Sequence, residues 1–292
     1  MTVLRVTHKT TYVYKKPVEL GEHRLMLRPR DSHDLRLLET TLAIDPPASA
    51  IRWIHDVFGN SIAITTFSQP SERLVFESGF RAEHYPLEAK ALEVESYASK
   101  FPFSYSAEDA MDLAHTRDRH YPDPEHKVDA WAKGMLEKTA GGETLAVLSA
   151  MTSEIKQQFK YAAREAAGVQ SPLETLELGT GSCRDFAVLM MEAVRSLGLA
   201  ARFVSGYLYD EKLVGAVSGL VGGGATHAWV QVFLPGAGWV EFDPTNALVG
   251  GRNLIRVAVA RDASQAAPLS GSYDGAPEDF ASMGVEVRVA AE

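Results

Sequence analysis

Cysteine is almost absent from this chain, since a single thiol, Cys183, occurs in 292 residues. One cysteine excludes an internal disulfide, so nothing in the sequence calls for an oxidising compartment. Long hydrophobic runs are also absent, because no segment approaches the ~18 uninterrupted apolar residues that a membrane-spanning helix requires. The N-terminus, MTVLRVTHKTTYVYKKP, alternates like a strand and lacks the apolar stretch of a signal peptide. These absences predict a cytoplasmic protein with no membrane partner.

Positive charge is in deficit as well. Lysine and arginine total 29 against 38 aspartate and glutamate residues, which gives a formal net charge of −9. This balance excludes a basic surface spread over the protein, so we expect no nucleic-acid partner. Residues 1–87 are close to neutral, and the rest of the chain carries the negative charge. The two parts of the chain therefore differ in net charge.

Motifs for cofactors and metals are missing too. The run GLVGGGAT at 219–226 lacks the G-K-[ST] of a phosphate loop and precedes an expected strand, so we interpret it as a mobile lid or rim beside His227. His115, His120 and His126 are spaced five and six residues apart and cannot share one helical face. We therefore predict neither a cofactor nor a metal.

The pattern along the chain divides it into three parts. Residues 1–87 contain five or six short segments with period-two alternation, which predicts an all-β, sandwich-like N-terminal domain. Residues 88–140 are polar with helical spacing, and we interpret them as a helical connector. Residues 141–292 start with helices and continue with strands, an order typical of an α+β fold. The strands are expected at 200–209, 226–234, 239–243, 254–260 and 285–290.

The thiol is predicted to lie at the start of a helix. Ser182 and Asp185 fit the S-x-x-[DE] capping signature around Cys183, and Gly198 follows the last helical residue. An apolar stripe that begins at Phe186 leaves the cysteine outside it. Backbone N–H groups and the helix dipole favour thiolate over thiol at such a position. A small buried hydrophobe is the ordinary alternative for a free cysteine.

The segment THAWVQVFLPGAGWVEFDPTN supplies a base and an acid. It is typical of a hairpin with His227 at the start of one strand and Asp243 at the end of the other, and therefore at the same end. The two side chains share a face only if the loop leaves an odd number of residues unpaired or the ladder holds a bulge. We predict five unpaired residues, with Asp243 opposite Trp229 and diagonal to His227. A strand-end histidine bonded to backbone and an aspartate that starts a turn are the structural alternatives.

These segments resemble a known family. GSCRDFAVLMMEAVRSLGLAARFVSGYL, the hairpin segment above and RNLIRVAVARD are similar to the core of the transglutaminase-like superfamily, in particular its bacterial cysteine proteases. RLMLRPR and HDVFGN resemble the β-rich region that precedes this core. The resemblance implies a papain-like α+β core over residues 141–292, with Cys183 as nucleophile, His227 as base and Asp243 as its orienting partner. Tyr161 and Trp229 are candidates for oxyanion binding or support of the site, and a packed core tyrosine is the alternative for Tyr161.

Thiol acyl transfer is the function that these patterns favour. Cys183 would attack a peptide or carboxamide carbonyl and form a thioester, which water hydrolyses in a cysteine protease or amidase. Transfer of the acyl group to an amine, as in a protein-glutamine transglutaminase, is one alternative. A catalytically silent binding module on the same fold is another. The expected partner is a protein or peptide substrate, and a homo-oligomer formed through the β-rich domain is a further expectation.

Overall fold

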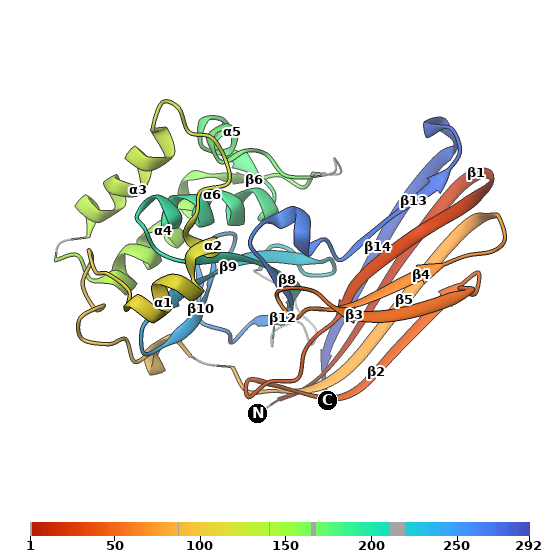
Figure 1. Cartoon of the computed structure of the whole chain (residues 1–292), viewed down its shortest axis with the longest axis horizontal. Helices are drawn as coiled ribbons and strands as arrows, with labels where there is room; N and C mark the ends of the chain where they lie inside the picture. The colour runs from red at the N-terminus through yellow and green to blue at the C-terminus, as the bar shows by residue number, and fades with distance from the viewer. Residues whose placement is uncertain (1, 87, 140, 165–167, 211–219) are drawn as a thin grey trace.

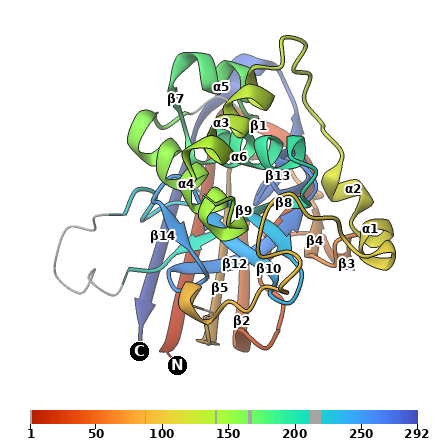
Figure 2. The same ribbon diagram turned by 90° about the vertical axis from the view of Figure 1, so that its left-hand side faces the viewer.

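A computed structural model describes residues 2–292 apart from 87, 140, 165–167 and 211–219. A large curved sheet lies beside a smaller sheet that is covered by helices (Figure 1). The two ends of the chain lie together at one end of the large sheet, as Figure 2 also shows, and the backbone N–H of Glu292 donates to the carbonyl of Val3 at 2.9 Å. Among the described helices, none combines the length and the apolar character needed to cross a membrane.

One long strand, β1 (Thr2–Arg28), organises the large sheet. Its first half pairs with β5 (Ser71–His84) and β14 (Phe280–Ala291), and its second half pairs with β4 (Ser61–Thr66) and β13 (Leu269–Asp274). The sheet is completed by β2 (Leu35–Asp45), which pairs with β5, and β3 (Ala50–His55), which pairs with β4. In the described part of the chain, seven antiparallel strands thus form one curled sheet. The all-β prediction for the N-terminal region is confirmed.

The smaller sheet is antiparallel and has the order β11-β10-β9-β8-β12. Its strands are β8 (Ala201–Leu208), β9 (His227–Leu234), β10 (Gly238–Asp243), β11 (Leu248–Val249) and β12 (Leu254–Ala260). Alternate residues of β9, such as Val230 and Val232, share a hydrophobic core with the helix α6 (Cys183–Ser196). Trp229, at an intervening position of β9, belongs to a separate hydrophobic cluster with Val204 and Leu254. The α+β prediction for this part of the chain is confirmed.

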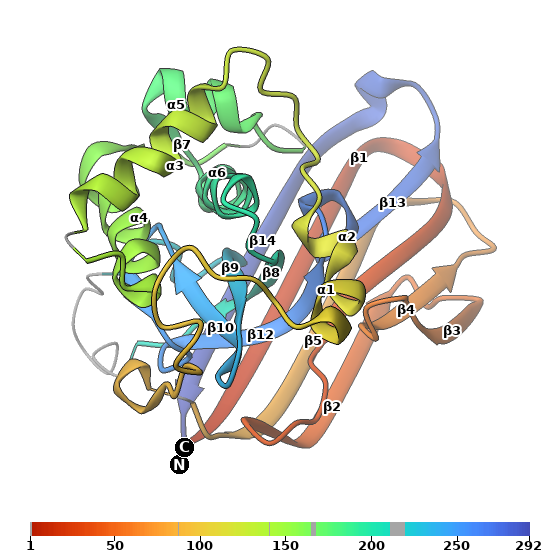
Figure 3. The ribbon, with the colours of Figure 1, turned by 60° about the vertical axis from the view of Figure 1, so that its left-hand side comes forward.

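Helices surround α6 on the side away from the sheet. Figure 3 looks nearly along α6 and shows α3, α4 and α5 around it. Every residue from Asp185 to Arg195 is buried, so the predicted apolar stripe is only part of a helix that is buried on all sides. The helices are α1 (Ala107–Asp112), α2 (Ala114–Arg117), α3 (Lys127–Lys138), α4 (Thr144–Gln158) and α5 (Pro172–Leu178), and short 3₁₀ turns are η1 (Ala89–Ala91), η3 (Ala263–Ala266) and η4 (Pro277–Asp279).

The structure corrects the helical interpretation of residues 88–101. Beyond η1, this segment is irregular and follows the tip of the β9–β10 hairpin, where the N–H of Glu95 donates to the carbonyl of Pro235 at 2.8 Å. Gly236, with a φ of +87°, lies so close that an added Cβ would meet the Glu93 carbonyl oxygen at 2.6 Å. Tertiary contacts with the hairpin have therefore overridden the local helical pattern.

The last strands of the chain do not join the smaller sheet. The strand expected at 285–290 is part of β14, which pairs with β1 from Leu4↔Ala291 onward. The strand β13, which the sequence pattern did not reveal, also pairs with β1. Period-two alternation predicts a strand but carries no information about its partner, and here the partner is about 280 residues away in sequence. The 141–292 segment therefore contributes strands to both sheets.

Side chains of the N-terminal region also anchor it to the smaller sheet. The amide of Asn60, in the motif HDVFGN, donates to the carbonyl of Val259 at 2.7 Å and accepts from its N–H at 2.9 Å. Asp34 pairs with Arg256 of β12 at 3.0 Å. These contacts hold the β3–β4 turn and the β1–β2 loop against β12.

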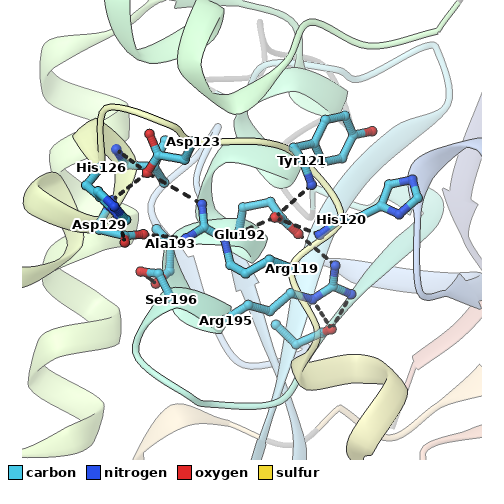
Figure 4. A network of polar contacts seen from close by, with 12 residues as sticks. Arg119, His120, Tyr121, Asp123, His126, Asp129, Glu192, Ala193, Arg195 and Ser196 are labelled. Atoms are coloured by element: carbon cyan, nitrogen blue, oxygen red, sulfur yellow. Dashed lines mark hydrogen bonds and ion pairs between the residues drawn. The ribbon is translucent and has the colours of Figure 1, made fainter.

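A buried carboxylate fastens the connector to α6. Glu192 is fully buried and pairs with Arg195 at 2.8 Å and with Arg119 at 3.3 Å (Figure 4). It also accepts from the backbone N–H groups of His120 and Tyr121, at 3.1 and 3.2 Å. Two cations and two N–H groups therefore converge on one carboxylate, which compensates for its burial.

Replacing Glu192 tests this anchoring. Glu192→Gln removes the charge that the buried guanidinium of Arg195 and the partly buried guanidinium of Arg119 share, and we expect a loss of about 3–5 kcal/mol in the free energy of unfolding. The matched control is Glu177→Gln, which breaks an exposed pair with Lys127 and should cost less than about 1 kcal/mol. Urea denaturation of both variants measures the difference. Equal losses in the two variants would contradict the anchoring role.

Candidate active site

A pair of two-residue strands positions Cys183. β6 (Lys160–Tyr161) and β7 (Thr180–Gly181) pair in parallel, and the N–H of Ala162 donates to the carbonyl of Gly181 at 2.9 Å. β7 leads directly into α6, so Cys183 is the first helical residue, as predicted. The residue is 7% exposed and belongs to the buried cluster around α6.

Asp185 holds the start of α6 in place through hydrogen bonds. One of its carboxylate oxygens accepts from both the backbone N–H and the hydroxyl of Ser182, each at 2.8 Å. The other oxygen accepts from Arg164 and from the backbone N–H of Gln170, each at 2.7 Å. This arrangement confirms the predicted capping role of Asp185. Both oxygens of the Asp185 carboxylate are engaged in these structural hydrogen bonds, so the carboxylate is not free to act on the thiol.

The hairpin has the predicted register but a shorter loop. Gly238 pairs with Leu234, and the ladder continues without a bulge to Phe242↔Val230. The next pair in this register is Asp243 opposite Trp229, which is the predicted alignment. Three residues, 235–237, remain unpaired, whereas five were predicted. Both numbers are odd, so both satisfy the parity condition that places Asp243 on the same face as His227.

His227 and Asp243 are directly hydrogen-bonded. The imidazole Nε2 lies 2.8 Å from Asp243 Oδ2, and both side chains are fully buried. The other ring nitrogen, Nδ1, has no hydrogen-bond partner among the described residues. Burial alone lowers the pKa of His227, but the charge and hydrogen bond of Asp243 outweigh it and, together with the adjacent Cys183 thiol, raise this pKa to about 10. The ring is therefore protonated near neutral pH, so Nδ1 also carries an N–H.

Asn246 adds a contact that the sequence analysis missed, although it lies within the quoted DPTN motif. Its Nδ2 donates to Asp243 Oδ2 at 2.8 Å and to the Val221 carbonyl at 3.1 Å, and its Oδ1 accepts from the Val221 N–H at 2.8 Å. The turn held in this way covers the imidazole, since a Cβ added to Gly222 would lie 2.7 Å from His227 Nδ1. Residues 220–226 thus form the rim predicted beside His227, and residue 219 lies outside the described residues.

Trp229 supports the histidine by packing. Its ring stacks on His227 with 6.0 Å between centroids and 27° between planes. The indole N–H donates to the buried carboxylate of Glu241, so it is not available to an oxyanion. Burial raises the pKa of Glu241, and the charge of Arg256 opposes that shift. Glu241, which the sequence analysis did not single out, holds the indole in place.

Tyr161 lies beside the thiol. Its pKa is raised by partial burial and then by the charge of Cys183, and its ring packs edge-on against Phe186 with 6.5 Å between centroids. No hydrogen bond of its hydroxyl is found within the described residues. The hydroxyl is therefore available as a donor, and the packing against Phe186 also fits the core alternative.

Metal ligation finds no support in the described ranges, where no group of three or more His, Cys, Asp or Glu side chains is arranged to hold an ion. The three histidines considered from the sequence have separate partners. His126 pairs with Asp129, His120 lies near Asp262, and His115 packs against Phe58.

Comparisons with known proteins agree with this architecture. Residues 4–83 match the bacterial transglutaminase-like N-terminal region, and residues 129–244 match the transglutaminase-like superfamily core. The Mycobacterium leprae protein ML0607 is 28% identical over 272 residues, which is 93% of each chain. Mycobacterium tuberculosis Rv2569c is 29% identical over 276 residues, covering 91% of this chain and 86% of that protein.

A solved structure shares the whole fold. A protein from Cytophaga hutchinsonii, described as a proposed cysteine protease, superimposes with a TM-score of 0.73 at 19% identity, over 99% of this chain and 90% of that chain. At this identity the likeness concerns the fold alone. With both family regions present in their expected order, the chain belongs to the transglutaminase-like superfamily and carries the bacterial N-terminal region of that family.

Proposed function

We propose that this protein is a thiol acyl-transfer enzyme, specifically a cysteine protease or amidase, with Cys183, His227 and Asp243 as its triad. One observation carries the proposal. His227 uses Nε2 for the hydrogen bond with Asp243. Its Nδ1 has no hydrogen-bond partner in the described structure, and the nearby Cys183 contributes to raising the pKa of the ring. A buried imidazole oriented in this way can exchange a proton with the thiol.

The reaction would proceed through a thioester. The sulfur, present as a thiolate paired with the protonated His227, attacks the carbonyl carbon of a peptide or carboxamide. The tetrahedral intermediate collapses as the C–N bond breaks, and the imidazolium returns its proton to the leaving amine or ammonia. Water, deprotonated by the imidazole, then attacks the thioester, releases the acid and regenerates the thiol. Asp243 holds the ring in the required orientation throughout.

Two donors would stabilise the oxyanion. The backbone N–H of Cys183 lies at the first position of α6, where it has no partner within the helix. The hydroxyl of Tyr161 is a second donor, since it is free of other hydrogen bonds in the described residues and close enough for the sulfur's charge to act on it. Trp229 would keep His227 in place.

Alkylation of Cys183 tests the thiol–imidazole pair. An ordinary thiol with a pKa near ~8.5 loses about 75-fold in reactivity between pH 8 and pH 6. In this protein we expect less than about a tenfold loss, because the imidazolium keeps the thiolate paired. The rate of iodoacetamide labelling, followed by mass spectrometry, measures it, and His227→Ala should restore the steep loss. A steep profile in the wild type that His227→Ala leaves unchanged would favour a silent binding module.

The pH dependence of stability tests the buried pair. Because folding raises the pKa of His227 from 6.5 to about 10, the pair stabilises the fold fully below pH 6.5, and this contribution is lost as the pH rises towards 10. The destabilisation caused by Asp243→Asn should therefore be larger at pH 6 than at pH 10 in urea denaturation. Asp45→Asn, at an exposed carboxylate, is the control and should show no such trend. A pH-independent effect of Asp243→Asn would refute the charged pair.

The products of a peptide reaction distinguish hydrolysis from transfer. We expect incubation with glutamine-containing peptides and a labelled primary amine to give hydrolysed product, in which water has replaced the leaving group. A product joined to the amine would indicate transglutaminase activity. Mass spectrometry detects both, and Cys183→Ala should abolish either product. Product that persists in Cys183→Ala would disprove the role of the thiol.

A further inference from the structure

A cavity of about 520 Å³ lies on the opposite face of the smaller sheet from α6. Its floor consists of side chains of β8, β9, β10 and β12, and its walls are the loop 30–35, the β3–β4 turn and the segment after β5. None of Cys183, His227 and Asp243 lines it. Its volume is in the range typical of small-molecule sites. It is therefore a site separate from the triad.

A polar ladder crosses the floor of this cavity. Arg202, Gln231 and Glu241 are direct register partners on three neighbouring strands. Arg202 Nε donates to Gln231 Oε1 at 2.7 Å, and Gln231 Nε2 donates to Glu241 Oε1 at 2.6 Å. The Gln231 side chain thus has both ends engaged, and it links the cation to the carboxylate without bringing them into an ion pair.

Two of the three carboxylates that line the cavity, Glu241 and Asp34, are already occupied. Glu241 accepts from Trp229, Gln231 and Arg256, and Asp34 accepts from Ser32 and from Arg256. Arg256 in turn has one terminal nitrogen on each carboxylate, at 2.9 and 3.0 Å. Glu241, Asp34 and Arg256 therefore already form hydrogen bonds within the protein, which leaves few of their donors and acceptors for a ligand.

Arg202 is the exception. Its guanidinium lies over the ring of Trp239, 4.1 Å from the centroid, and it forms no ion pair with a described carboxylate. Its two terminal nitrogens make no hydrogen bond within the described structure, and the residue lines the cavity. Burial lowers the pKa of Arg202 to about 9 despite the charge of Glu241, and the charges of Arg256 and Arg30 lower it further. The group is still protonated at neutral pH and has no carboxylate partner among the described residues.

We propose that this cavity binds a small molecule that carries one carboxylate beside an apolar group, with Arg202 as the anchor of the carboxylate. The two terminal nitrogens of a guanidinium match the two oxygens of a carboxylate. Phe58, Leu92 and Val240 line the same cavity and provide apolar contact. A dianion such as phosphate is disfavoured, because Asp31, Asp34 and Glu241 place three carboxylates in the lining.

The probe is N-acetylphenylalanine, with N-acetylphenylalaninamide as a partner of the same shape without the charge. For a ligand of roughly 15 non-hydrogen atoms, the expected dissociation constant is near 0.5 mM. Isothermal titration of the full chain at low salt measures both compounds. We expect the acid to bind at least ten times more tightly than the amide. Equal binding of the two, or no binding of the acid up to 10 mM, would overturn the proposal.

Variants assign the binding to the anchor. Arg202→Gln should weaken binding of the acid at least tenfold, whereas Arg30→Gln, which removes an equal charge from an exposed position on the cavity wall, should weaken it less than threefold. Unchanged binding in Arg202→Gln, or equal losses in both variants, would contradict Arg202 as the anchor. Thermal melting checks that each variant is folded. If Arg202→Gln does not fold, Arg202→Lys keeps the charge without the planar fork, and a loss of at least threefold is then required.

Discussion

The hydrogen bond between His227 and Asp243 depends on a parity condition in the β9–β10 hairpin. Side chains alternate between the two faces of a strand, so a shift of one residue in the register would place the carboxylate on the face opposite the imidazole. The three-residue turn at 235–237 satisfies the condition. Both side chains are buried, so neither could find a substitute partner in water. The geometry of the candidate triad therefore rests on the length of a turn remote from it.

Two buried carboxylates fix the helix that carries the thiol. Asp185 ties the first turn of α6 to the segment around Arg164 and Gln170, and Glu192 ties its middle to Arg119 and the connector. A helix held at both places has little freedom to slide on the sheet. The position of Cys183 relative to β9 is then set by the same contacts that stabilise the core, which is how a precise site is built on a rigid scaffold.

The face of the sheet away from α6 has a different character. Trp229 stacks on His227 and donates to Glu241, which in turn receives Gln231 and Arg256. Arg256 reaches Asp34 in the loop after β1, so a continuous polar chain runs from the N-terminal region to the tryptophan that supports the histidine. The N-terminal region thus covers part of the face of the smaller sheet that lies away from α6. Asn60 and the strands that return to β1 hold it there.

Much of the site could be predicted from local sequence. The capping signature at Ser182 and Asp185 and the start of the strand at His227 depend on residues near in sequence, and the register of a hairpin follows from its own alternation and loop parity. The length of the loop could not be predicted in this way, because three and five unpaired residues satisfy the same parity. Asn246 was visible in its motif, but only its contact with Val221 gives it a role.

Other features depended on tertiary structure, because they arise between segments far apart in the chain. Local sequence patterns predicted most of the longer strands, the start of the thiol-bearing helix and the face of the hairpin that carries the histidine. The tertiary structure alone decided that 285–290 pairs with β1, that α6 is buried on every side and that 88–101 follows a hairpin tip. It also decided that Arg202 lines a cavity without an ion pair to any described carboxylate. Local patterns encode backbone conformation and amphipathicity, whereas the choice of partner is made by packing over the whole molecule.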